Sequence, residues 1–321
     1  MKRITFLTII LSTVAMIAYG GKSKVDKHPT TDGSIIRYST IETSGKSQLT
    51  KLLAEYVAGK NSRIGVAVIV DHLEAASVNG DQKFEMMSVV KFPLALAVAD
   101  YCDKAGISFS DSVDIKSSEM VEGTWSPMAL KYGNRDLRLP ILELLEYALI
   151  ESDNNACDAL IKLVGGIEAV GPYVKSLGMT ETTIGATEAD MHHDRSTSKL
   201  NSTTPSEMAF LFDRFETTLR HENSHMATIA DILERCATGT NRLPSALPAQ
   251  GTTIGHKTGT GFTMADGNVT AVNDVGYVVL PDGSHYSIAV FVGGGYGMRA
   301  SEKIISDIAK IVYDQIGDKK E

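Results

Sequence analysis

The chain has 321 residues, of which 43% are hydrophobic and 22% are charged, proportions typical of a soluble globular protein. Its formal net charge at pH 7 is −8. A protein this acidic is a poor partner for nucleic acid or for an anionic membrane surface, so we expect neither.

The first twenty residues have the pattern of a secretory signal peptide. Lys2 and Arg3 form a positive start, residues 4–18 form an apolar run, and Ala18-Tyr19-Gly20 offers small residues for cleavage. The apolar run is short for a membrane span, although an uncleaved anchor is the alternative. We therefore predict a signal peptide over 1–20, an exported, periplasmic protein, and no stable membrane association after cleavage.

Alternating helix and strand patterns begin after a polar stretch. Residues 21–44 show no period and are predicted to be a loose linker. A helix is expected over 47–60, where leucines recur at helical spacing, and strands are expected over 64–70 and 75–78.

The middle of the chain, from about 92 to 242, is predicted to be mainly helical. Helices are expected up to Gly106 and over 140–150, 156–164, 206–219 and 226–237. Residues 180–205 are polar and lack a period, which indicates either a functional or a flexible loop.

Strand patterns return after Pro248. Strands are expected over 253–256, 271–280 and 286–292, and a helix over 301–316 carries isoleucine and valine at intervals of four. The predicted fold class is α/β (α+β), with a five-stranded antiparallel sheet flanked by N- and C-terminal helices. An all-helical lobe (88–242) interrupts an α/β lobe (45–87 plus 243–321), and a site is expected where the two lobes meet.

Three cysteines, Cys102, Cys157 and Cys236, are widely spaced in apolar, helix-like surroundings. A chain of this length does not need disulfides for stability, which favours buried free thiols. A single disulfide among the three remains open.

A candidate nucleophile lies at the start of the first apolar helix of the middle region. Ser88 and Lys91 belong to the run Met-Met-Ser-Val-Val-Lys-Phe-Pro over 86–93. Residues at i and i+3 share a helix face, so the Lys91 amine can reach the Ser88 hydroxyl and serve as the base that activates it. The spacing alone is weak evidence, because Ser196 and Lys199 repeat it within a polar run.

Two further tripeptides strengthen the signal. Ser152-Asp153-Asn154 lies between two predicted helices, and Lys257-Thr258-Gly259 lies on the first strand after the helical region. The first tripeptide also suits a plain helix N-cap. With Ser-x-x-Lys in this order, however, the chain resembles the class A serine β-lactamases over essentially all of its mature length. Residues 124–127 and 188–192 make it most similar to the cephalosporinase branch of that class.

The resemblance implies hydrolysis of penicillins and cephalosporins, and hence resistance to them, through an acyl-enzyme on Ser88. Lys91 would take the serine proton or hold a neighbouring carboxylate and water. Ser152 would protonate the departing nitrogen, and Glu188 would activate the water that hydrolyses the ester. Whether Lys91 or Glu188 is the base in acylation is left open.

The same resemblance implies a set of substrate-binding residues. Asn154 would bind the side-chain amide of the substrate, while Lys257, Thr258 and Thr260 would bind its carboxylate. Gly259 would let the substrate approach the edge of the strand closely. Arg242 would be an additional ligand of the carboxylate, and Trp125 would be the aromatic residue at the mouth of the cleft.

Two features depart from the family pattern. His192 stands where many class A enzymes have an asparagine that shares the hydrolytic water with the glutamate, and the paired cysteines of some members are missing. If water delivery failed, the chain would be a penicillin-binding D-Ala-D-Ala peptidase or a β-lactam sensor that does not hydrolyse its ligand. We expect a monomer that needs no cofactor. We also expect no bound metal, since the histidines near Glu188 lack the spacing of a metal site.

Overall fold

The computed structural model describes residues 44–133 and 135–317. The predicted signal peptide and nearly all of the predicted linker lie outside the described residues. Those that are described belong to one compact unit.

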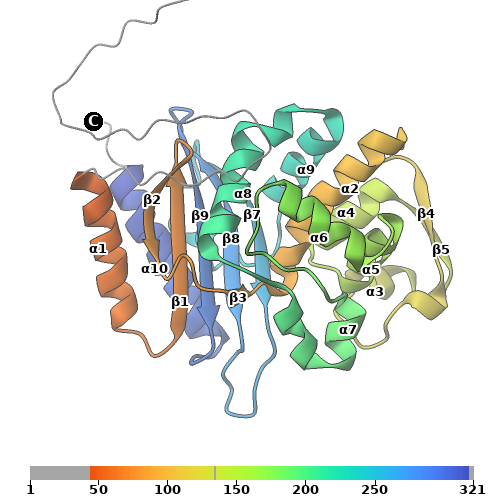
Figure 1. Ribbon diagram of the computed structural model, residues 1–321. Helices are drawn as coiled ribbons and strands as arrows, with labels where there is room; N and C mark the ends of the chain where they lie inside the picture. The colour runs from red at the N-terminus through yellow and green to blue at the C-terminus, as the bar shows by residue number, and fades with distance from the viewer. Residues whose placement is uncertain (1–43, 134, 318–321) are drawn as a thin grey trace, which may run out of the picture. The chain divides into compact units, whose positions relative to one another are not determined.

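A five-stranded antiparallel sheet forms the centre of the fold, in the strand order β2-β1-β9-β8-β7 (Figure 1). Its strands are β1 (Arg63–Val70), β2 (Leu73–Val78), β7 (Thr253–Thr260), β8 (Val272–Val279) and β9 (His285–Gly293). The prediction of a five-stranded antiparallel sheet is confirmed. Strand β7 is an edge of the sheet, and it carries the predicted Lys-Thr-Gly motif.

Helices cover both faces of this sheet, which explains why β1 and β9 are apolar and buried along most of their length. Side chains alternate between the two faces of a strand. On β1, Val66 and Val68 point into a core shared with α1 (Ser44–Ala58) and α10 (Met298–Ile316). Their neighbours Ala67 and Ile69 point into the core on the other face, shared with α8 (Pro205–Thr217) and the remaining helices (Figure 1).

The segment between β2 and β7 supplies the other helices. They are α2 (Lys91–Ala105), α3 (Pro127–Tyr132), α4 (Ile141–Ile150), α5 (Asn154–Leu163), α6 (Ile167–Ser176), α7 (Glu188–His193) and α9 (Ser224–Glu234). Short 3₁₀ segments are η1 (Met87–Val90), η2 (Ser117–Glu119), η3 (Arg195–Leu200), η4 (Leu219–His221) and, just before β7, η5 (Leu243–Ala246).

The region expected to be all-helical also contains short strands. β4 (Ser112–Ile115) pairs with β5 (Leu137–Pro140), and β6 (Ser202–Thr203) pairs with β3 (Phe84–Glu85). Strands this short have too few residues for a recognisable alternation, and their partners are far away in the sequence. The division into two lobes stays a prediction, because the cores follow the two faces of the sheet.

The polar stretch 180–205, predicted as a functional or flexible loop, contains α7, η3 and β6. Its order comes from side chains that bond the backbone. Fully buried Asn201 accepts from the backbone N–H groups of Gly185 and Ala186 and donates to the Ala186 carbonyl oxygen. Thr187 caps α7 by accepting from the backbone N–H of Asp190.

All three cysteines are free thiols, so the open question of a disulfide is answered. Within residues 44–133 and 135–317, no helix is long and apolar enough to cross a membrane. Over the same ranges, no group of three or more His, Cys, Asp or Glu side chains is arranged to hold a metal ion.

Candidate active site

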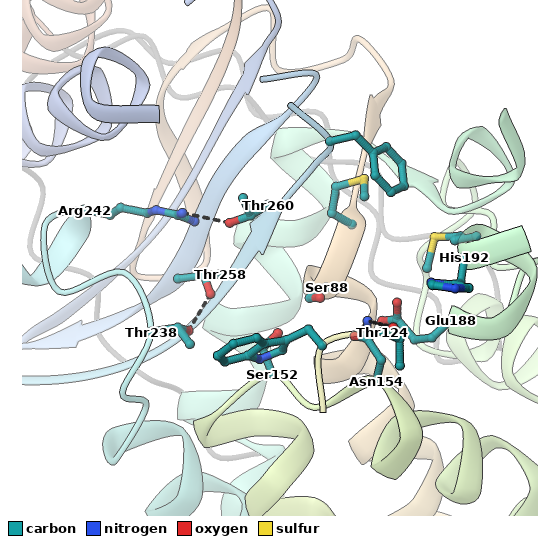
Figure 2. A pocket seen from close by; sticks show the side chains of 14 residues that line it. Ser88, Thr124, Ser152, Asn154, Glu188, His192, Thr238, Arg242, Thr258 and Thr260 are labelled. Atoms are coloured by element: carbon teal, nitrogen blue, oxygen red, sulfur yellow. Dashed lines mark hydrogen bonds between the residues drawn. The ribbon is translucent and has the colours of Figure 1, made fainter. Parts of the chain in front are cut away.

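A cavity of about 380 Å³ lies between the edge strand β7, the 3₁₀ turn η1, the α4–α5 junction and α7. In Figure 2, Ser88 stands between the β7 threonines on one side and Asn154 and Glu188 on the other. Of the predicted site residues, those that line the cavity are Ser88, Trp125, Ser152, Asn154, Glu188, His192, Arg242, Thr258 and Thr260. Lys91, Lys257 and Gly259 lie directly behind its wall.

Ser88 is presented by the short 3₁₀ turn η1, which runs without a break into α2. The preceding Met87 has a left-handed backbone with φ of 49°, a conformation that costs a non-glycine residue about 1–3 kcal/mol. Behind Ser88, α2 is buried over residues 91–99 and ends at Gly106, whose positive φ closes the helix. A strained turn on a rigid helix therefore holds the hydroxyl at the cavity wall.

Lys91 is the hub of the polar contacts around Ser88. Its ammonium donates to Ser88 Oγ at 3.0 Å, to the Ser152 carbonyl oxygen at 2.8 Å and to Asn154 Oδ1 at 2.7 Å. It also forms an ion pair with Glu188 Oε1 at 2.9 Å. The side chain is completely buried, and this carboxylate and the neutral oxygens offset the loss of water around the cation.

Glu188 is the first residue of α7, and a carboxylate on α5 fixes that end of the helix. Asp158 Oδ1 and Oδ2 accept from the backbone N–H groups of Glu188 and Ala189, each at 2.8 Å. Burial is the main cause that raises the pKa of Asp158 to about 6. Sequence reasoning missed Asp158, although it lies one turn after Asn154 on the same face of a predicted helix.

Ser152 and Lys257 meet at the base of the cavity. Lys257 Nζ donates to Ser152 Oγ at 3.1 Å and to the Thr258 carbonyl oxygen at 3.0 Å. Ser152 has a left-handed backbone with φ of 62°. Burial, followed by smaller effects that include the nearby Lys91 charge, lowers the pKa of Lys257 to about 8.

The other two residues of the Ser-Asp-Asn motif have different surroundings. Asp153 is fully buried and is the N-cap of α5, accepting from the backbone N–H of Ala156, and it also accepts from Ser126 Oγ. The N-cap interpretation is therefore correct for this member of the motif. Asn154 accepts from Lys91, and its Nδ2 donates to Thr124 Oγ1 at 2.8 Å.

Strand β7 passes so close to η1 that position 259 requires glycine. A Cβ at Gly259 would lie 2.4 Å from the Met86 carbonyl oxygen. Arg242, only 4% exposed, donates to Thr260 Oγ1 at 2.8 Å and to the Gly259 carbonyl oxygen at 3.2 Å (Figure 2). Its guanidinium thus adjoins the same end of the cavity as Thr260.

Two aromatic rings mark the mouth of the cavity. Trp125 is 59% exposed, and its Nε1 donates to the Glu151 carbonyl oxygen at 2.8 Å. On the opposite wall, the Arg195 guanidinium lies 4.9 Å from the centre of the Phe262 ring and links η3 to the β7–β8 connection. The lining residues that sequence analysis did not select are Met87, Thr124, Met191, Thr238 and Phe262.

His192 lies on α7 and lines the cavity on the same side as Glu188 (Figure 2). Its ring packs edge-on against that of His193, with 5.9 Å between the ring centres. The imidazole thus lies on the same side of the cavity as the Glu188 carboxylate.

Comparison with known proteins identifies the family that has this arrangement. A sequence model described as the β-lactamase enzyme family matches residues 45–316. The chain belongs to the β-lactamase enzyme family. This β-lactamase is 36% identical over 282 residues to the extended-spectrum β-lactamase PER-1 of Pseudomonas aeruginosa, covering 87% of this chain and 91% of that protein. It is also 36% identical to a β-lactamase of Bacteroides uniformis, covering 86% of this chain and 94% of that protein.

Solved structures agree with the sequence relatives. A class A β-lactamase from Bacteroides cellulosilyticus superimposes with a TM-score of 0.82 at 35% identity, covering 87% of this chain and 100% of that one. The extended-spectrum β-lactamase TLA-1 gives a TM-score of 0.81 at 35% identity, with 85% and 99% covered. The predicted family, class, fold and β-lactam-hydrolysing activity, with the resistance it confers, are confirmed.

Proposed function

We propose that this β-lactamase hydrolyses its substrates through a covalent ester on Ser88 and a water activated by Glu188. The observation that carries the proposal is the contact of one buried ammonium, that of Lys91, with both Ser88 Oγ and Glu188 Oε1. Nucleophile, cation and carboxylate form an unbroken chain at the wall of one cavity.

In acylation, Ser88 Oγ attacks the lactam carbonyl carbon, and the C–O bond forms as the ring C–N bond breaks. The serine proton leaves to Lys91 once its ammonium has given a proton to Glu188, or it leaves to Glu188 by way of a water, and both routes are open in this geometry. Ser152 gives its proton to the departing nitrogen, and the proton that left Ser88 replaces it, so that the base returns to its starting form. Its hydroxyl accepts from Lys257 Nζ, and the positive charge there favours the release of that proton.

In deacylation, Glu188 takes a proton from water as the water oxygen attacks the ester carbon, and the ester C–O bond then breaks as Ser88 Oγ leaves with the proton returned by Glu188. Anchoring by Asp158 and the ion pair with Lys91 support this role, since they hold the carboxylate at the cavity wall. We propose that His192, on the same wall, hydrogen-bonds that water in place of an amide.

Substrate binding is assigned to the two ends of the cavity. The substrate carboxylate would be bound by two threonines, Thr258 and Thr260, and by two cations, Lys257 and Arg242. Each cation already contacts one of these threonines: Arg242 donates to Thr260 Oγ1, and Lys257 donates to the Thr258 carbonyl oxygen. Gly259 lets the substrate approach the edge of β7, and the backbone N–H groups of Ser88 and Thr260 would bind the developing oxyanion.

At the opposite end, Asn154 would bind the side-chain amide and exposed Trp125 would contact the side chain. We propose that cephalosporins are favoured substrates, in line with the similarity to extended-spectrum β-lactamases.

Turnover separates this mechanism from acylation without hydrolysis. Excess chromogenic cephalosporin is mixed with the mature protein, and ring opening is followed over time. Many turnovers per enzyme are expected. A single stoichiometric burst that then stops would support the penicillin-binding or sensor alternative.

Two substitutions test the assigned roles by intact mass spectrometry. Ser88→Ala should form no adduct with the antibiotic, and an adduct on that variant would remove Ser88 as the nucleophile. Glu188→Ala should acylate and then accumulate the ester, because no carboxylate remains at that position to activate water. Turnover at the normal rate in that variant would exclude Glu188 from deacylation.

We also propose that the protein is exported to the periplasm, free of the membrane after cleavage, and acts as a monomer. The amino-terminal sequence pattern and the relationship to other β-lactamases support export. Cell fractionation and the mass of the mature chain test the localisation, and size-exclusion chromatography with light scattering tests the monomer.

A further inference from the structure

The segment that follows α9, residues 235–242, contacts both threonines of β7 that line the cavity. Thr258 and Thr260 are two positions apart on the strand, so their side chains share one face. Thr238 Oγ1 lies 2.6 Å from Thr258 Oγ1, and Arg242 Nη2 donates to Thr260 Oγ1 at 2.8 Å (Figure 2). Each hydroxyl that is proposed to bind the substrate carboxylate therefore has a partner in this one segment.

The direction of the hydrogen bond is certain at Thr260. An arginine guanidinium has N–H donors and no acceptor, so Thr260 Oγ1 must be the acceptor. The single proton of the Thr260 hydroxyl then remains available for another group. A carboxylate can only accept, so this is the polarity that a carboxylate-binding hydroxyl needs.

At Thr258 the geometry allows either direction, because each of the two hydroxyls can donate or accept. If Thr258 donated to Thr238, its proton would be used, and its oxygen would turn only lone pairs toward the carboxylate. If Thr238 donates, Thr258 keeps its proton for the substrate, as Thr260 does. The other contact of Thr238 Oγ1, with Cys236 Sγ at 3.5 Å, is the weaker one, because sulfur is a weak hydrogen-bond partner.

Packing holds the Thr258 side chain in this orientation. Gly239 has a φ of 70°, and a Cβ at that position would lie 2.5 Å from Thr258 Cγ2. The hydroxyl of Thr258 thus meets Thr238, while its methyl group meets the backbone of the next residue. The backbone N–H of Arg242 donates to the Gly239 carbonyl oxygen at 2.8 Å and closes this turn. Contacts on both branches of the Cβ atom fix the χ1 angle of Thr258.

We propose that Thr238 is a positioning residue for the β-lactamase reaction: its hydroxyl donates to Thr258 Oγ1 and leaves the Thr258 proton for the substrate carboxylate. The inference rests on the proposed binding of that carboxylate by Thr258. Thr238 acts through Thr258 and does not touch the substrate. Hydrogen-bonded hydroxyls polarise one another, so donation by Thr238 also makes Thr258 a stronger donor.

Steady-state kinetics with an anionic cephalosporin test the proposal. Thr238→Val removes the hydroxyl and keeps the branched shape of the side chain. Its KM should rise about threefold to tenfold, the effect of weakening one hydrogen bond to a charged group. The kcat should change little, because the bond already acts in the ground state. Thr238→Ser keeps a hydroxyl and should restore KM.

Thr228→Val is the matched control. It makes the same chemical change on α9, where Thr228 Oγ1 donates to the Ser224 carbonyl oxygen at 2.8 Å. Its KM and kcat should equal those of the wild type. An unchanged KM in folded Thr238→Val would overturn the inference.

The charge of the substrate provides a second readout. The methyl ester of the same cephalosporin has no ionised carboxylate, and hydrogen bonds to neutral groups are weaker. The KM of Thr238→Val divided by that of wild type should therefore fall toward one with the ester. An equal ratio for acid and ester would mean that Thr238 only shapes the cavity, and the inference would fail.

Thr258→Val separates this inference from the proposed function. If that variant has the wild-type KM, Thr258 does not bind the carboxylate, and its proposed role fails together with the inference. If its KM rises, the double variant Thr238→Val/Thr258→Val should show the same KM as Thr258→Val, because Thr238 has no hydroxyl left to act through. A further rise in the double variant would show that Thr238 contacts the substrate directly and would overturn the positioning role alone.

Discussion

Arg242 shows how one side chain both supports the edge of the sheet and adjoins the substrate site. Its guanidinium donates to Thr260 Oγ1 and to the carbonyl oxygens of Gly259 and Asn273, at 2.8, 3.2 and 2.9 Å. A planar fork of N–H groups can satisfy three acceptors at once, and a lysine ammonium cannot reproduce that geometry. The cation is thus fixed beside the proposed carboxylate-binding threonines.

We predict that Arg242→Ala lowers kcat/KM by about tenfold to a hundredfold, the effect of losing one or two charged hydrogen bonds. KM should account for most of the change, because the lost interaction already acts in the ground state. Arg242→Lys should recover little of it. Steady-state kinetics with an anionic cephalosporin would measure both variants.

Arg235→Ala is a suitable control, since that guanidinium is 52% exposed and pairs with Glu146 outside the site. An unchanged KM in folded Arg242→Ala would show that Arg242 only supports the strand.

Single residues differ in how far the sequence could identify them. Ser88 and Lys91 were predicted because an i, i+3 spacing places both on one helix turn and because the Ser-Asp-Asn and Lys-Thr-Gly tripeptides follow in order. Phe262 was not, because its contact with Arg195 joins segments that are distant in the chain. Asp158 could have been found from its helical spacing to Asn154, whereas nothing in the sequence reveals that it bonds the backbone of Glu188.

Among the elements, α7 matters most for hydrolysis, and it is held chiefly at its first turn. It has only six residues, too few for a stable helix in isolation. Asp158 accepts from two backbone N–H groups at its start, and Thr187 caps the same end. The position of Glu188 therefore depends on a carboxylate from another helix.

We predict that Asp158→Ala slows deacylation more than acylation, because α7 loses this anchor and Glu188 loses its fixed position. The acyl-enzyme should accumulate during turnover, and intact mass spectrometry together with the burst amplitude would measure it. Asp100→Ala is the control, since that residue pairs with Lys104 on α2, away from the cavity. Equal slowing of both steps would contradict a specific effect on Glu188.

The pKa of Asp158 adds a stability test of the same anchor. Its folded-state pKa of about 6 lies above the usual 3.8, so the folded state binds the extra proton between these values. Its contribution to folding is most favourable below about pH 4 and is lost as the pH rises through about 6. Denaturant unfolding would measure the free energy of unfolding of Asp158→Ala and of wild type. The value for the variant minus the value for wild type should therefore increase as the pH rises from about 4 to about 6. A constant difference would mean that Asp158 titrates normally.

Element prediction worked where apolar periodicity was long and failed where order comes from polar bonds. Strands β1 and β9 and the helix at 301–316 carry extended apolar patterns. The stretch 180–205 carries none, yet buried Asn201 and the Thr187 cap order it. Such bonds depend on which backbone groups a side chain meets after folding, and hydropathy does not record that.

At the scale of the whole molecule, the sheet separates two cores with different tasks. The core on the α8 face includes η1 and α2, which present Ser88. The core on the other face is formed by α1, α10 and the strand side chains that point toward these two helices. None of its residues lines the cavity. Changes in this second core should therefore affect stability and leave the chemistry intact.

Ile308 on α10 tests that separation, because it is fully buried in the second core. Truncation of a buried isoleucine removes apolar contacts and leaves a cavity, so Ile308→Ala should lower the unfolding free energy by about 2–5 kcal/mol. The kcat and KM of the remaining folded protein should match wild type. Ile311→Ala, on the same helix but only partly buried, should cost less. A change in kcat for Ile308→Ala at a temperature where it is folded would mean that the far core also holds the active-site geometry.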